Sequence, residues 1–72
     1  MMIRFWLSNI RLDAGMTHDE VAKNVGVKRQ YYSMIENGER TPSVKVARKI
    51  GEVLNFNWTL FFEGIGNEMK RA

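Results

Sequence analysis

Residues 17–38 read THDEVAKNVGVKRQYYSMIENG, and this stretch decides how the chain folds. Thr17 lies three residues before Glu20, which is the spacing of a capping box at the start of a helix. The apolar positions that follow end at Gly26, a residue that can take the left-handed conformation with which many helices close. A second helical pattern begins within about two residues. The stretch therefore predicts two short helices that cross steeply, because so short a turn does not allow antiparallel packing.

The apolar residues of this stretch fall where a helix-turn-helix motif needs them. The motif requires a small residue where the helices meet, a turn residue that tolerates positive φ, and inward apolar side chains on both helices. These places are filled by Ala22, by Gly26, and by Val21, Val25, Val27, Tyr32 and Ile35. We expect the second helix, residues 28–36, to be a DNA-recognition helix, because such a helix lies in the major groove.

Further helices are expected on both sides of the motif. Apolar residues at helical spacing predict a helix over about residues 3–14: Ile3, Trp6, Leu7, Ile10 and Ala14. After the loop of residues 37–42, Ser43 can cap a helix that Asn55 closes, and a last short helix begins near Asn57. No strand pattern is found, so we expect an all-α bundle of five helices. The residues expected in its core are Phe5, Trp6, Met16, Ile50, Leu54, Phe56 and Phe61.

Length and composition limit the domain count and the class of function. The chain has 72 residues, so we expect residues 1–72 to form a single domain. The absence of cysteine and the single histidine exclude a disulfide framework and a cysteine-ligated zinc site, and we expect no metal and no cofactor. No catalytic set of side chains is recognisable, so we expect no enzyme. Neither a membrane span nor a signal peptide is visible, which predicts a cytoplasmic protein without a membrane partner.

The positive charge is concentrated in the middle of the chain. The formal net charge is +3, made up of −1 in residues 1–22, +5 in residues 23–49 and −1 in residues 50–72. A surplus of this kind indicates a polyanionic partner. Taken without the helix pattern, the charge distribution is more typical of a solvated basic face.

Seven short motifs recur in the order of one known family: IRL at residues 10–12, GMT at 15–17, EVA at 20–22, VGV at 25–27, IENG at 35–38, RTPS at 40–43 and WTLFF at 58–62. With these motifs the sequence resembles the phage repressor/Cro family of helix-turn-helix regulators, also called the xenobiotic-response-element type, over about residues 5–62. The resemblance implies a five-helix, lambda-repressor-like domain that binds a two-fold DNA operator as a homodimer. It also implies a partly buried ion pair between Arg11 and Glu36.

Four residues depart from the family's usual pattern. His18 stands where the family commonly has a phosphate-binding Gln, and we expect it either to donate to a phosphate or to be an exposed first-turn residue. Lys28 replaces the usual Ser or Thr cap of the recognition helix. Tyr32 replaces a core Ile or Val, so its surroundings must adjust or its hydroxyl must reach the edge of the core. Glu39 removes one positive charge from the loop that follows.

The polar residues of the motif divide into two expected sets. Those expected to read DNA bases are Lys28, Arg29, Gln30, Ser33 and Met34. Arginine pairs with guanine and glutamine with adenine, whereas methionine can only pack on a thymine methyl. Those expected to bind phosphates are Thr17, His18, Tyr31, Asn37, Arg40, Thr41 and Ser43. The alternative for both sets is a solvated surface, with loop side chains that only satisfy their own backbone.

The last short helix is expected to contribute a dimer interface. Its bulky side chains cannot all be buried in so small a domain, and Trp58, Leu60 and Phe62 are the expected contact residues. We therefore expect a sequence-specific transcriptional regulator, most simply a repressor, with operator DNA and a second copy of itself as partners. The alternative is an antitoxin-type interaction module that binds a protein antagonist and also regulates its own operon.

Overall fold

The computed structural model describes residues 2–63, and the statements below concern this part of the chain. Its elements are α1 (Phe5–Asp13), α2 (His18–Val25), α3 (Arg29–Glu36), α4 (Val44–Leu54) and the 3₁₀ helix η1 (Trp58–Phe62). Residues 2–63 contain no strand, so the all-helical expectation is confirmed. The count of five helices is not confirmed, because the last element is a single short 3₁₀ segment. Its tighter turn is visible in the hydrogen bond from Leu60 N to Asn57 O, 3.1 Å long.

The helix ends follow the capping residues of the sequence. At the start of α2, Glu20 N donates to Thr17 Oγ1 at 3.1 Å and Thr17 N donates to Glu20 Oε1 at 2.9 Å, which completes the capping box. Gly26 closes α2 in the left-handed region, with φ of 89°. At α4, Val46 N donates to Ser43 Oγ, and left-handed Asn55 ends the helix. The predicted ends of α2 and α4 are thus confirmed.

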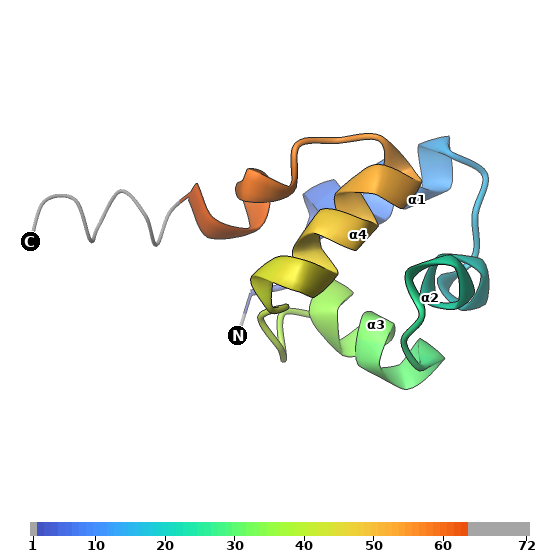
Figure 1. Cartoon of the computed structure of the whole chain (residues 1–72), viewed down its shortest axis with the longest axis horizontal. Helices are drawn as coiled ribbons and strands as arrows, with labels where there is room; N and C mark the ends of the chain where they lie inside the picture. Colours follow the sequence, from blue (N-terminus) through green and yellow to red (C-terminus); the bar gives the residue numbers. More distant parts are fainter. Residues whose placement is uncertain (1, 64–72) are drawn as a thin grey trace, which may run out of the picture.

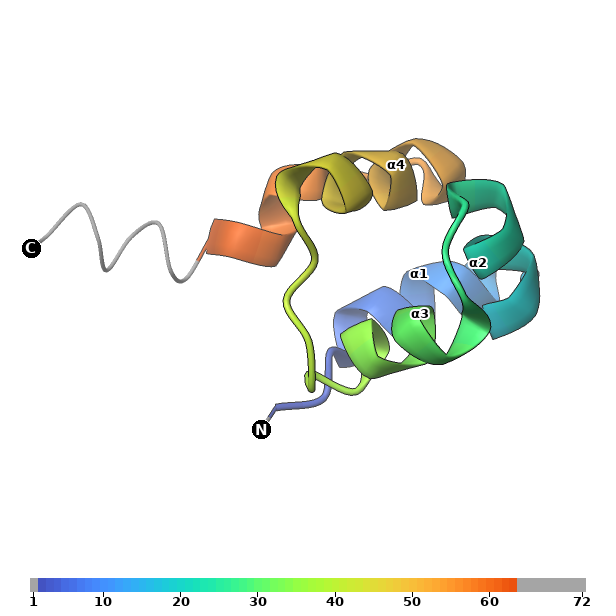
Figure 2. The same cartoon turned by 60° about the horizontal axis from the view of Figure 1, so that its bottom comes forward.

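The four α-helices surround a small core with α2 and α3 crossing steeply at one side. In Figure 1, α4 lies in front of α1, α3 runs along the lower edge, and α2 stands at the right. Figure 2 shows α1 and α3 side by side beneath α4, and these two helices are in contact. The N-terminal segment lies beside the loop between α3 and α4 in both views. This arrangement leaves the outer face of α3 uncovered.

The core is centred on residues from all four α-helices. Its largest fully buried side chains are Leu7, Val21, Tyr32, Ile35 and Ile50. The aromatic ring of Trp6 packs edge-to-face against Phe56 and Phe61, with ring centroids 5.5 and 5.1 Å apart. These contacts connect α1 to η1 and to the segment before it.

Phe5 corrects the expected core. Its side chain is 66% exposed, although we expected it to be buried. The cause is the helical period, since Phe5 lies two positions and therefore about 200° from Leu7, which is fully buried on the inner side of α1. The predicted helix over residues 3–14 is also too long, because α1 begins at Phe5 and leaves Ile3 in the extended segment before it.

No helix within residues 2–63 combines the length and the apolar character that crossing a membrane would require.

Candidate nucleic-acid interface

A buried carboxylate connects α3 to the two helices beside it. Glu36, at the end of α3, is only 4% exposed. Arg11 Nε of α1 donates to its Oε2 at 2.6 Å, and Arg11 Nη2 donates to its Oε1 at 3.3 Å. Tyr32 Oη also donates to Oε2 at 2.6 Å, and His18 Nε2 of α2 lies 3.1 Å from Oε1. One carboxylate therefore fixes α1, α2 and α3 to one another, and we call these four residues the Glu36 network.

The charges of this network are mutually stabilised. Burial by itself would raise the pKa of Glu36, but hydrogen bonds from Arg11, Tyr32 and His18 outweigh it and hold the pKa below its ordinary value. The hydrogen bond with Glu36 in turn raises the pKa of Arg11. Burial and the bond to the carboxylate raise the pKa of Tyr32, which remains a neutral donor. The ion pair is thus fully charged at neutral pH.

His18 and Tyr32 take positions that the sequence did not specify. His18 was expected to donate to a phosphate or to be an exposed first-turn residue, yet its side chain is only 32% exposed and its Nε2 faces Glu36. The expectation of an exposed residue is therefore wrong. Only Nδ1 of the ring remains for a phosphate. Tyr32 was expected to adjust its surroundings or to reach the edge of the core with its hydroxyl; the whole residue is buried and the hydroxyl donates to the Glu36 carboxylate.

The residues expected to read bases lie on the uncovered side of α3. Lys28, Arg29 and Gln30 are exposed, and Ser33 and Met34 are half-buried. Lys28 stands at the N-cap position without a side-chain cap, as its side chain cannot accept a hydrogen bond. Residues 29 and 33 are one helical turn apart, and so are residues 30 and 34. The four side chains therefore lie on one side of the first two turns of α3.

An open hollow of about 430 Å³ lies at the start of α2, and Arg29, the first residue of α3, also borders it. It is bounded by the α1–α2 turn and the start of α2, and Arg11, Thr17, His18, Asp19 and Arg29 are among its lining residues. The backbone N–H groups of a helix start and two arginines are groups that bind phosphate. The sequence placed Thr17 and His18 in such a site, but not Arg11 or Arg29. No local pattern could show this, because the hollow forms between helices.

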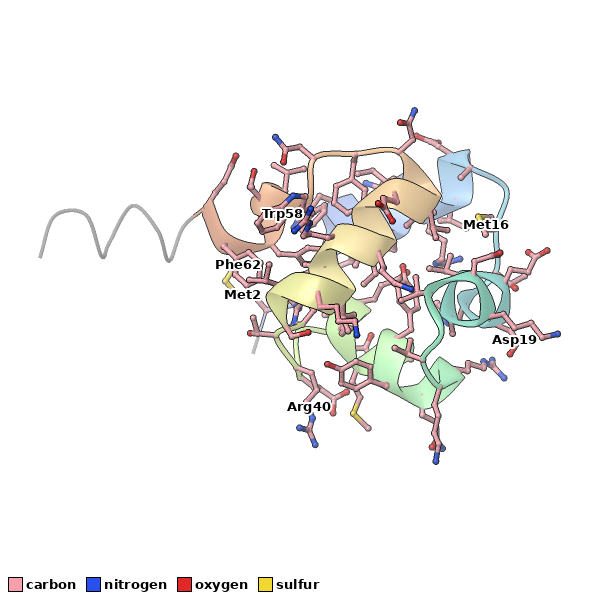
Figure 3. All side chains as sticks on the ribbon, in the orientation of Figure 1. Met2, Met16, Asp19, Arg40, Trp58 and Phe62 are labelled. Carbon is pink, nitrogen blue, oxygen red and sulfur yellow. The ribbon has the colours of Figure 1, made fainter. Side chains whose placement is uncertain are left out.

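A second group of expected phosphate-binding residues lies at the other end of α3. Asn37, Arg40, Thr41 and Ser43 are all exposed in or beside the α3–α4 loop. Figure 3 shows the Arg40 side chain extending from the body at the edge where α3 lies. Tyr31, the remaining member of the set, is half-buried against the core. The structure thus divides the expected phosphate-binding residues between the two ends of α3.

Arg4 also belongs to this region, although nothing in the sequence pattern distinguishes it from other charged residues. Its guanidinium donates to backbone oxygens at the end of α3 and in the α3–α4 loop. Its partners lie 31 and 36 residues away in the sequence, so no spacing rule points to them.

The expected dimer residues differ in exposure. Leu60 is 38% exposed, whereas Trp58 and Phe62 are half-buried and pack against each other with ring centroids 6.1 Å apart. Residues 2–63 contain no group of three or more His, Cys, Asp or Glu side chains that could hold a metal ion.

The sequence is similar to those of transcriptional regulators. A family model described as "Helix-turn-helix" matches residues 7–61. The uncharacterized HTH-type transcriptional regulator YqaF of Bacillus subtilis (strain 168) is 56% identical over 69 residues, which cover 96% of this chain and 91% of that protein. An uncharacterized HTH-type transcriptional regulator of Archaeoglobus fulgidus is 40% identical over 53 residues, covering 74% of this chain and 76% of that protein.

The Glu36 network predicts a stability that depends on pH. Glu36→Gln should lower the free energy of unfolding at pH 7 by about 3 kcal/mol, because Arg11 loses its charged partner in a largely buried position. Since the folded pKa of Glu36 is lowered, its contribution is fully present above the unfolded carboxyl value of about 4.3 and is lost as pH falls through the folded value. Urea unfolding at pH 7 and at pH 3.5 measures the difference between variant and wild type.

Glu39→Gln is the matched control, because Glu39 is an exposed carboxylate close by in sequence. It should change stability by less than about 0.5 kcal/mol at both pH values. A gap between Glu36→Gln and wild type that stays the same size at pH 3.5 would contradict the assignment of Glu36 as a charged, low-pKa group.

Proposed function

We propose that this chain, which belongs to the Cro/C1-type helix-turn-helix family of transcriptional regulators, acts as a repressor that occupies a two-fold DNA operator with α3 in the major groove. DNA-binding regulation of transcription follows from family membership. The observation that best supports the more specific proposal is the position of α3. Its uncovered face lies between two groups of candidate phosphate-binding residues, one at each end of the helix.

In this proposal the base-reading residues are Lys28, Arg29, Gln30, Ser33 and Met34. Arg29 and Gln30 carry most of the sequence preference, because each can form two hydrogen bonds with one base edge. Both are exposed in the first turn of α3, the part of a recognition helix that reaches the bases.

Phosphates are bound on both sides of the base-reading face. Thr17 and His18 hold one phosphate in the hollow at the start of α2, together with backbone N–H groups. A second phosphate is held beside the α3–α4 loop by Asn37, Arg40, Thr41 and Ser43. The hydroxyl of Tyr31, on α3, is a further phosphate contact. Contacts of this kind fix the register of the protein on the duplex and carry no sequence information of their own.

The homodimer forms in this proposal through η1, with Leu60 at the centre and Trp58 and Phe62 beside it. A two-fold operator requires two recognition helices about 34 to 36 Å apart, and an interface at one end of the domain can set this distance. The 38% exposure of Leu60 supports a small contact that is weak without DNA.

Arg29→Ala and Gln30→Ala are predicted to reduce base discrimination at one or two operator positions by about 1 to 3 kcal/mol each. The fold should remain intact, because both side chains are exposed. Binding to the selected operator and to single-base variants measures the effect. Lys23→Ala, an exposed cation on α2, serves as a control that should leave base preferences unchanged. Equal losses on operator and random DNA would contradict direct reading by these residues.

Arg40→Ala is predicted to weaken binding to all sequences alike. The slope of log K against log salt should become shallower by about 0.9, the value for one phosphate contact on duplex DNA. Titrations of a random-sequence duplex between 50 and 200 mM salt measure this slope. Arg48→Ala removes the same charge from α4, outside the proposed phosphate set. If it changed the slope as much as Arg40→Ala does, the effect would reflect net charge and not a contact by Arg40.

Leu60→Glu is predicted to fold, to remain monomeric and to lose cooperative binding to a two-fold operator. A charge at the centre of an apolar contact loses its hydration when the contact forms. Sedimentation and operator titration measure the two effects. In sedimentation, Leu12→Glu is the control, because Leu12 is an exposed leucine of α1 and should not affect association. Unchanged cooperativity for Leu60→Glu would place the interface elsewhere, first at exposed Phe5.

A further inference from the structure

Arg4 joins three separate parts of the domain. Its backbone N donates to Glu36 O at 2.7 Å, and its Nη1 donates to Ile35 O at 2.5 Å and to Arg40 O at 3.0 Å. Its guanidinium carbon lies 5.6 Å from the centre of the Phe61 ring of η1. One residue thus contacts the end of α3, the loop that carries Arg40, and the aromatic core.

These bonds supply donors to the last two carbonyls of α3, those of Ile35 and Glu36. The last carbonyls of a helix have no partners within the helix. Met34 O accepts from Glu39 N at 2.9 Å and Ile35 O from Gly38 N at 3.2 Å, and Arg4 Nη1 is a second donor to Ile35 O. Glu36 O accepts from the backbone N of Arg4. A cation at this end is also favoured by the helix dipole. Arg4 therefore closes the recognition helix from outside it.

The segment that carries Arg4 lies directly against the loop. Gly38 has φ of 81°, and a Cβ atom built on it would lie 1.8 Å from Met2 O. Only a residue without a side chain allows this approach. The backbone of residues 2–4 therefore packs on the loop, and Arg4 holds the two segments together.

We propose that Arg4 is a positioning residue for DNA binding, which holds the loop of residues 37–43 in the place where Arg40 meets a phosphate. The inference rests on the proposed function, because it assumes that Arg40 binds DNA. It goes beyond the family's pattern, because Arg4 precedes residues 7–61 that the family model covers.

An arginine suits this role better than other donors. Its guanidinium is planar, so Nη1 can serve two carbonyls while the flat face lies over an aromatic ring. Burial lowers the pKa of Arg4, yet arginine remains protonated in proteins. The Arg40 side chain is exposed and extends from the body, whereas its carbonyl is bonded to Arg4. Arg40 is therefore held to Arg4 by its backbone carbonyl, while its side chain is left for the candidate contact with DNA.

A double-mutant cycle between Arg4 and Arg40 tests this proposal. The full chain is titrated with a random-sequence duplex between 50 and 200 mM salt, as wild type, Arg4→Met, Arg40→Ala and the double variant. Arg40→Ala should reduce the salt slope by about 0.9 in the wild-type background. In the Arg4→Met background the same change should reduce it by less than about 0.3, because an unanchored Arg40 no longer holds its phosphate.

The same reduction in both backgrounds would overturn the proposal, and it is also the result expected if Arg4 itself bound a phosphate. Arg48→Met is the matched control, because Arg48 also lies over an aromatic ring, at 6.0 Å from the centre of Trp58. In that background Arg40→Ala should keep its full effect of about 0.9. A reduced effect of Arg40→Ala in the Arg48→Met background as well would show that the cycle detects only general destabilisation, and the proposal would fail.

Two further measurements keep the result decisive. Circular dichroism confirms that each variant is folded at the temperature of the titration. If Arg4→Met is not, all four proteins are titrated at a lower temperature at which it is folded, with the same expected and contradicting outcomes. A wild-type chain that shows no salt-dependent binding to the duplex would refute the proposed function. Salt-dependent binding with an additive cycle would refute only the role of Arg4.

Discussion

The buried carboxylate of Glu36 is the contact on which the arrangement of the other elements depends. A carboxylate removed from water is costly unless charged and polar donors surround it. Here Arg11, Tyr32 and His18 all donate to it or lie at hydrogen-bond distance. Because these partners come from α1, α3 itself and α2, the requirement to satisfy one charge fixes three helices. A short helix with few inward side chains thereby obtains an orientation that apolar packing alone would not define.

The backbone of the same residue has a complementary role. While the Glu36 side chain holds α3 against α1 and α2, its carbonyl accepts from Arg4, which also bonds Ile35 and Arg40. The end of α3 is therefore held by polar contacts from both its side-chain and its backbone groups. No further helix packs on its outer face within residues 2–63. This is why a polar, exposed surface can be presented with a defined direction by a domain of this size.

Features that depend on near neighbours in the chain could be predicted from the sequence, and those that depend on distant ones could not. The capping box of Thr17 and Glu20 was predictable because both partners lie within one turn. Tyr32 and Glu36 are four residues apart on one helix, so their spacing is that of side chains that can form a hydrogen bond. The partner of His18 is 18 residues away and could be found only from the fold. Phe5 was assigned to the core on its size alone, although the helical period turns it outward.

The residue types of the candidate site could be predicted from the sequence, but the hollow that brings Arg11 and Arg29 beside Thr17 and His18 could not. The hollow at the start of α2 is lined by both Arg11 and Arg29, but the charge of Arg11 is balanced by Glu36. Of these two arginines, Arg29 is therefore the one without an ion pair within residues 2–63. Arg29 can therefore be directed toward a phosphate in the hollow or toward a base edge, since one guanidinium cannot serve both fully. Gln30 does not line the hollow and carries no charge. Of the two residues, Gln30 is consequently the one whose proposed role is confined to reading bases.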